Sequence, residues 1–318
     1  MKKSNFDFIG KRKYAFTFSA CLMALGLIFN FIFGTQLDIQ FVGGAIVSYT
    51  YTGSIDDQQV EDMVQEVTGR DVDVQTNQDV MLAGSENTVN QLSLEFAGNN
   101  ALSLDQQREI TSRLQEQYPE QNVAQSESNS VDPSMGQRFL LKCVFALALA
   151  SILMMVYVAF RFKKMGWSAG VMALVALLID IITVYFTFII FRIPVDDNFI
   201  AVALTILGYS LNDTIIIYDR IREKRRTAGP KTDLGQLVNE SINQNLGRTI
   251  NTSLFTFLAV ACVFVVSLVY NLPSVTAFAL PMMVGVVSGC YTTNFLVGPL
   301  WVMWKGHVAK RRAAKAEA

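Results

Sequence analysis

The fold is decided by the stretch SAGVMALVALLIDIITVYFTFIIF at residues 168–191, in which Asp180 is the only charged residue. About 20 mostly apolar residues in a helix cross a hydrocarbon layer of about 30 Å, so this stretch predicts a transmembrane helix. The composition agrees, since 51% of the residues are hydrophobic, 17% are charged and the mean hydropathy is +0.32. Soluble chains carry about 25% charged residues, which argues against a soluble enzyme and excludes a disordered chain.

Five other stretches meet the same requirement of length and apolarity. They are residues 14–34, 139–160, 199–218, 249–270 and 276–304. The first is too long for a removable signal peptide and lacks a cleavage site of small residues, so we expect it to be retained. The sequence therefore predicts an α-helical polytopic membrane protein with six transmembrane helices.

The orientation follows from the basic residues near the span ends. Lys and Arg cluster before the first span, between spans two and three, between spans four and five, and after span six. Because cytoplasmic loops carry an excess of Lys and Arg, both termini are predicted to lie inside. The basic run 220–226 is explained by contact with anionic membrane lipids. Binding to a cytoplasmic partner is the alternative explanation for that run.

Residues 35–136 form a long segment outside the membrane and differ sharply in charge from the rest. They contain 17 Asp or Glu and 3 Arg, a net charge of −14, whereas the remainder of the chain carries +13. The exclusion of Lys and Arg from translocated segments explains this sign. An acidic surface can also attract or repel partners.

The hydrophobic period of this outer segment changes in a regular order. Residues 41–51, 71–76 and 88–96 have the composition or alternation of strands, and a last extended stretch follows Pro119. A helix is predicted after Ser54 and ends at Gly69, with its apolar face formed by Val60, Met63, Val64 and Val67. A second helix begins with the capping pair Ser103 and Gln106, and its apolar face is formed by Ile110, Leu114 and Tyr118. The resulting order β-α-β-β-α-β predicts an α+β ferredoxin-like domain.

These patterns divide the chain into four parts. Residues 1–34 are the inner N-terminus and first membrane helix, and residues 35–136 are the outer domain. Residues 137–304 are helices two to six with an inner loop at 219–248, and residues 305–318 form a basic inner tail.

Besides Lys142, which is near one end of its span and can reach the interface, three charged groups lie at membrane depth, where each costs about 3 kcal/mol or more. They are Asp180 in the third span, Asp213 in the fourth and Arg248 at the start of the fifth. A buried carboxylate beside a movable Arg can exchange a proton, because burial favours its neutral form and the cation its charged form. Asp213 and Arg248 are therefore a candidate proton relay, and a static pair that joins two helices is the equal alternative. Asp180 is either a weaker relay candidate or hydrogen-bonded to a neighbouring helix.

Polar residues extend from these groups along both helices. Tyr209 and Asn212 recur at helical spacing beside Asp213, and Thr252 lies one turn from Arg248. We expect the two stripes to face each other inside the bundle, since lipid cannot satisfy them, and we predict supporting roles for these three residues in the relay.

Specific strings give the chain a resemblance to a known family. GYSLNDTIIIYDRIREK at 208–224 and SINQNLGRTINTS at 241–253 resemble the SecF members of the SecD/SecF family. FDFIGKRK at 6–13 and LDIQFVGG at 37–44 resemble the opening of such chains. A departure is Asn294, which stands where the family more often has an aliphatic residue.

The resemblance implies membership of the resistance-nodulation-division superfamily and a place in the bacterial plasma (inner) membrane. It implies pairing with SecD, docking on the SecYEG channel and contact with exported unfolded polypeptides, with SecA and a membrane insertase as further partners. The implied function is use of the proton motive force in late, SecA-ATP-independent steps of translocation. The implied relay residues are Asp213 and Arg248. A carboxylate suits H⁺, and Na⁺ has to be considered as well.

Two other functions stay open: a stand-alone proton-coupled exporter of a small molecule or lipid, and a membrane scaffold that transports nothing. The sequence contains no nucleotide-binding loop, catalytic triad or metal motif, so we expect no enzyme activity, cofactor, bound metal or nucleic-acid partner. Gly43 and Gly44 join the first span to the outer domain. They act either as a hinge for that domain or as a tight turn that only glycine fits.

Overall fold

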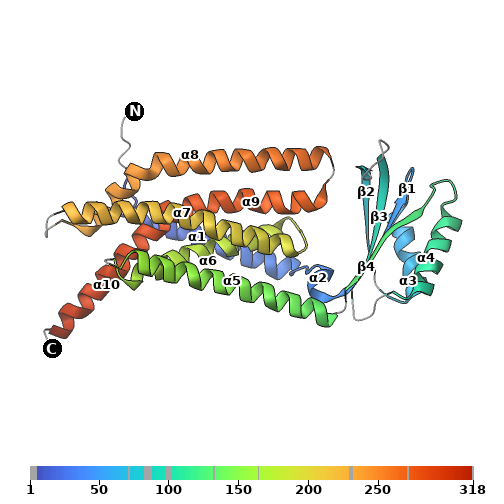
Figure 1. Cartoon of the computed structure of the whole chain (residues 1–318), viewed down its shortest axis with the longest axis horizontal. Helices are drawn as coiled ribbons and strands as arrows, with labels where there is room; N and C mark the ends of the chain where they lie inside the picture. Colours follow the sequence, from blue (N-terminus) through green and yellow to red (C-terminus); the bar gives the residue numbers. More distant parts are fainter. Residues whose placement is uncertain are drawn as a thin grey trace.

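The computed structural model describes residues 6–70, 72–81, 88–97, 102–131, 133–163, 165–228, 232–270 and 272–316. Six of its helices or helical runs are long and apolar enough to cross a membrane. In Figure 1 they lie side by side, with a small sheet domain at the end of the bundle opposite the two chain termini. The six runs are Arg12–Phe33, Met135–Arg161, Trp167–Ile190, Asp197–Thr227, Leu234–Val269 and Ser274–Arg311. Each of the six predicted spans is therefore confirmed as a helix or helical run of membrane-spanning length.

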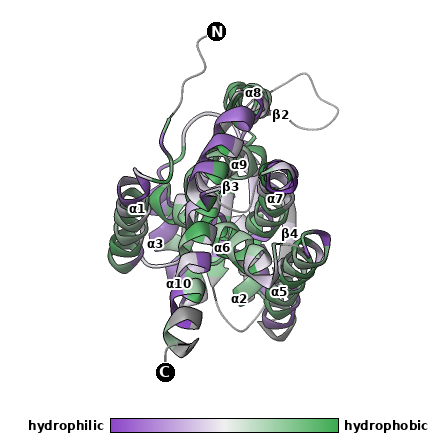
Figure 2. Cartoon of the chain, turned by 90° about the vertical axis from the view of Figure 1, so that its left-hand side faces the viewer, coloured by the Kyte–Doolittle hydropathy of each residue, from purple (hydrophilic) through white to green (hydrophobic). Residues whose placement is uncertain are grey.

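The central helix of the bundle is α6 (Trp167–Ile190), which contains the stretch quoted at the start. A helix that is apolar all round is stable only when neighbours cover it or lipid surrounds it. Here α6 packs mainly against four helices, with smaller contacts to the last helical segments of the chain, and Figure 2 shows it in the middle of the bundle. The four are α1 (Arg12–Phe33), α5 (Pro133–Arg161), α7 (Asp197–Thr227) and α9 (Pro273–Thr292).

The last predicted span contains an irregular turn. After α9 the chain forms a π-helical segment, η1 (Thr293–Val297), and continues as α10 (Gly298–Ala316). On the other side of the bundle, α8 (Leu234–Val269) follows α7 after a short connection. The predicted inner loop at 219–248 is thus mostly helical, because α7 continues to Thr227 and α8 begins at Leu234.

The outer segment folds as a four-stranded antiparallel sheet with two helices. In chain order its elements are β1 (Gly44–Tyr51), α3 (Asp57–Thr68), β2 (Asp73–Met81), β3 (Thr88–Ala97), α4 (Leu104–Gln117) and β4 (Ala124–Val131). The strands lie in the order β2-β3-β1-β4. This is the predicted sequence of elements, and the predicted apolar faces of both helices are buried against the sheet in one core.

The ends of these elements follow the sequence signals, with one correction. Asp56 caps α3, Gly69 ends it with a left-handed φ of 66°, and Ser103 with Gln106 forms a capping box on α4. The first strand was predicted to begin at Phe41, but Ile39–Val42 forms a one-turn helix, α2, and β1 begins at Gly44. The backbone turns at Gly43, whose φ is 87°.

Close helix contacts depend on glycine at particular positions. A Cβ at Gly170 of α6 would lie 2.8 Å from the Met155 carbonyl oxygen of α5, whereas a Cβ at Gly208 would meet nothing within 4 Å. We expect Gly170→Ala to destabilise the chain by about 1–3 kcal/mol, because the two backbones must separate. Gly208→Ala is the control, and it should be neutral or stabilise by up to about 1 kcal/mol. Unfolding midpoints of the purified variants measure both, and equal midpoints would contradict the close packing of α5 and α6.

Candidate functional site

Asp213 and Arg248 lie near each other at the contact of α7 and α8 but differ strongly in exposure. Asp213 is 2% exposed, and its Oδ2 has no hydrogen-bond partner among the described residues. Arg248 is exposed on the surface of the described chain. The Arg248 charge is within electrostatic range of Asp213, yet no ion pair within 4.0 Å joins them in the part of the chain that the structure describes. The carboxylate is therefore buried beside a cation without being bound to it.

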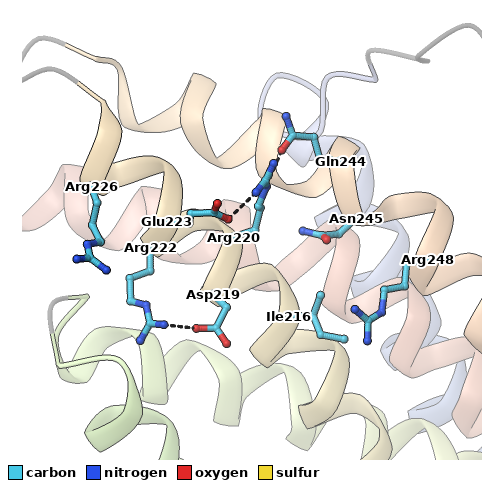
Figure 3. A pocket seen from close by; sticks show the side chains of 9 residues that line it. All are labelled: Ile216, Asp219, Arg220, Arg222, Glu223, Arg226, Gln244, Asn245 and Arg248. Atoms are coloured by element: carbon cyan, nitrogen blue, oxygen red, sulfur yellow. Dashed lines mark hydrogen bonds and ion pairs between the residues drawn. The ribbon is translucent and has the colours of Figure 1, made fainter.

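A polar pocket of about 570 Å³ opens between α7 and α8 beside this pair. Its lining side chains, shown in Figure 3, are Ile216, Asp219, Arg220, Arg222, Glu223, Arg226, Gln244, Asn245 and Arg248. Ile216 and Arg248 lie together in that view, apart from the ion-paired residues. Ile216 is three residues, about one helical turn, from Asp213 on α7. The pocket thus reaches Arg248 and ends about one helical turn from Asp213, which is buried and is not among its lining residues.

Two other arginines of the pocket, Arg220 and Arg222, have partners. The Arg222 Nη2 is 2.8 Å from the Asp219 Oδ1, and the Arg220 Nε donates to the Gln244 Oε1 at 2.7 Å. Arg220 also pairs with Glu223. Arg248 differs from Arg220 and Arg222, because its guanidinium makes no ion pair or hydrogen bond among the described residues, and its charge acts on Asp213 from a distance.

The predicted supporting residues are placed differently from one another. The Tyr209 hydroxyl donates to the Ser253 Oγ at 3.0 Å and joins α7 to α8. Asn212 and Thr252 are exposed, so the expectation that both predicted stripes face each other inside the bundle is not met at these positions. The inward face of α7 instead contains Asp213 beside Ser210 and Thr214, and that of α8 contains Thr249 and Ser253.

Asp180 of α6 is fully buried and has a complete set of hydrogen bonds. The Ser210 Oγ donates to its Oδ2 at 2.7 Å, the Ser288 Oγ donates to its Oδ1 at 2.6 Å, and the Thr292 Oγ1 lies 3.0 Å from both oxygens. These donors belong to α7 and α9, so one carboxyl group ties the central helix to two neighbours. The structure thus shows the hydrogen-bonded arrangement that the sequence left as one of two alternatives.

The connection from α1 to the outer domain is held by the backbone. Asp38 donates its N–H to the Val195 carbonyl at 3.1 Å, and Val195 donates to Gln36 at 2.8 Å. Burial raises the pKa of Asp38, whose carboxylate accepts from the Gln40 N–H. Gly43 and Gly44 have φ values of 87° and 154°, which side-chain-bearing residues rarely adopt. These angles require glycine and favour the tight turn, while a hinge at these positions stays a prediction.

Six helices of membrane-spanning length define a polytopic membrane protein, and two carboxyl groups, those of Asp180 and Asp213, are buried among its helices. The family model for the protein export membrane protein SecD/SecF, C-terminal, matches residues 110–307. The chain therefore belongs to the SecD/SecF family.

Relatives and solved structures support this assignment. The chain is 32% identical to the protein translocase subunit SecDF of Bacillus subtilis over 97% of its length, which is 39% of that protein. It is 29% identical to the subunit SecF of Alicyclobacillus acidocaldarius and covers 97% of itself and 96% of the relative. The crystal structure of SecDF from Thermus thermophilus, a translocon-associated membrane protein, matches with a TM-score of 0.77 and 28% identity, over 95% of this chain and 39% of that one. The chain thus spans about two fifths of SecDF chains and nearly all of SecF chains.

Proposed function

We propose that this chain is a SecF-like accessory subunit of the Sec protein-export translocase. It pairs with SecD, docks on SecYEG and uses an ion gradient across the bacterial inner membrane to promote late steps of translocation, after SecA has acted. Both termini lie in the cytoplasm, and the outer ferredoxin-like domain contacts the exported unfolded polypeptide. A membrane insertase and membrane lipids are further partners.

The observation that carries this proposal is the buried Asp213 carboxylate beside an Arg248 that is not ion-paired to it. A static pair joining two helices would place the charged groups in direct contact. Separated charges next to a polar pocket instead allow Arg248 to move and change the affinity of Asp213 for a cation. This arrangement supports an ion relay over a structural link.

Pairing with SecD is supported by the exposed polar face of α8. Arg248, Asn251 and Thr252 are exposed on a helix that is otherwise apolar enough to span a membrane. Polar groups that face lipid are unfavourable, and interhelical hydrogen bonds satisfy them. A partner with polar groups on its own membrane helices would cover this face.

We expect Arg248→Met to reduce gradient-driven export to the level seen without the chain, while SecD still co-purifies with the variant. The Met side chain replaces the unbranched aliphatic part of Arg but carries no charge, so it no longer responds to the charge of Asp213. Arg226→Met is the matched control. It removes the same charge from the lining of the same pocket, but Arg226 lies near the end of α7, more than three helical turns from Asp213. Export into vesicles with an imposed gradient measures the effect.

Wild-type export by Arg248→Met would contradict the relay. A chain that purifies as a homo-oligomer without SecD or the channel would favour the stand-alone exporter. Export that is unchanged by an uncoupler, and lost only when the whole chain is deleted, would favour the scaffold.

A further inference from the structure

Three helices meet at a small polar layer formed by Tyr209 of α7, Ser253 of α8 and Cys290 of α9. Tyr209 donates to Ser253 at 3.0 Å, and the Cys290 thiol interacts with the Ser253 hydroxyl. Tyr209 and Cys290 are also within electrostatic range of each other and of Asp213. These contacts place the three residues at one level of the bundle.

One helical turn farther toward the α7–α8 connection lies a second layer. Asp213 follows Tyr209 by four residues, Asn294 follows Cys290 by four, and Thr249 precedes Ser253 by four. The chain direction of α8 is opposite to that of α7 and α9, so all three steps run the same way along the bundle.

Other contacts fix the same register. The Thr214 and Thr293 hydroxyls, each adjacent in sequence to a member of the second layer, are 3.4 Å apart. A Cβ at Gly298, one turn beyond Asn294, would lie 2.9 Å from Ile242 of α8. By this register a carboxylate, an amide and a hydroxyl, all buried, belong to the same level of three packed helices.

Each residue of this second layer has a buried oxygen without a hydrogen-bond partner among the described residues. The atoms are Asp213 Oδ2, Thr249 Oγ1 and Asn294 Oδ1, on side chains that are 2%, 0% and 1% exposed. The Asn294 Nδ2 already donates to the Cys290 carbonyl at 2.7 Å, which leaves its oxygen free to act as an acceptor. The Asn294 Nδ2 is directed at the carbonyl and the thiol of Cys290, and a carboxylate and an amide oxygen only accept. The Thr249 hydroxyl is therefore the donor that remains for the three oxygens.

We infer that Asp213, Thr249 and Asn294 form a binding site for Na⁺. Hard cations prefer carboxylate, carbonyl and hydroxyl oxygens, and a single carboxylate balances one positive charge. A proton binds to one carboxylate oxygen, whereas Na⁺ is bound by several oxygens. The neutral oxygens of Thr249 and Asn294 would be ligands of Na⁺ but are not needed to bind a proton. The site adjoins η1, and π-helical turns are frequent at functional sites.

This inference rests on the proposed function and names its coupling ion. Bound Na⁺ would replace Arg248 as the positive charge facing Asp213 and release the exposed guanidinium to move. Occupancy of the site and the position of Arg248 are then linked. A cation gradient changes the occupancy of the site, and through it the position of Arg248, and this can drive motion of the complex.

The test is the thermal stability of the purified full chain in rising NaCl, with choline chloride holding the ionic strength constant. Wild type should gain a few degrees in Tm as the site fills. Asn294→Leu and Thr249→Val should raise the NaCl concentration for half-maximal protection at least about tenfold. Thr252→Val is the control for Thr249→Val, because it makes the same change on the exposed face of α8 and should behave as wild type.

The Tm values in choline alone show whether each variant is folded. Equal protection of wild type by NaCl and choline chloride, or protection that Asn294→Leu and Thr249→Val retain in full, would overturn the site. In vesicles, export driven by a proton gradient without any effect of Na⁺ would overturn it and leave the proposed function standing. Na⁺ protection in a chain that no gradient stimulates would support the site and overturn the proposed function.

Discussion

Asp213→Asn is expected to reduce gradient-driven export to the level of vesicles without the chain. Asn has nearly the shape of Asp but carries no charge, so it can neither exchange a proton nor attract a cation. Asp213 Oδ2 accepts no hydrogen bond from the described residues, and the substitution therefore breaks none there. We expect the free energy of unfolding to stay within about 1 kcal/mol of wild type, since no packing is lost.

The matched control for this substitution is Asp219→Asn, two turns farther along α7. Asp219 pairs with Arg161 and Arg222, its side chain is 35% exposed, and such pairs contribute at most about 1 kcal/mol. Export with and without an imposed gradient should separate the two variants: Asp219→Asn should keep most of the stimulation and Asp213→Asn none. Equal stimulation of both would remove Asp213 from the mechanism.

Asp180→Leu is expected to have the largest effect on stability. The substitution leaves the hydroxyls of Ser210, Ser288 and Thr292 without their shared acceptor in a fully buried position. Hydrogen bonds between membrane helices contribute about 0.6–1.7 kcal/mol each, so we expect a loss of about 2–5 kcal/mol. Asp180→Asn keeps one acceptor oxygen and should lose about half as much. Thermal unfolding of the purified chain in detergent measures both.

Ser151→Ala is the control for loss of a buried polar group, since Ser151 bonds only to Leu147 of its own helix among the described residues. If Asp180→Leu and Ser151→Ala unfold at the same midpoint, the hydrogen bonds from Ser210, Ser288 and Thr292 to Asp180 do not hold the helices together. The Asn variant also tests the predicted support of the relay by Asp180. Loss of gradient-driven export in a variant that remains folded would assign Asp180 to the ion pathway.

Local sequence patterns were sufficient for the elements of this fold. A run such as residues 168–191 can cross a membrane only as a helix, because a helix satisfies its own backbone hydrogen bonds in lipid. The cap at Ser103 and the stop at Gly69 are local signals, and both lie where the sequence predicted them. Asp213 and Arg248 were identifiable for a similar reason, since a charged group at membrane depth is costly and therefore conspicuous.

The sequence by itself determined six membrane-length helices, an α+β segment between the first two of them, and the two charged residues of the candidate relay, Asp213 and Arg248. Only the tertiary structure decided which faces of those helices meet. In a membrane both the lipid-facing and the buried sides of a helix are apolar, so periodicity does not fix its rotation. That is why Asn212 and Thr252 were expected inside but are exposed, and why Thr249 and Asn294, separated by 45 positions, were not recognised as lying at the level of Asp213 in the bundle. Their common level arises from the packing of three helices, which no single segment specifies.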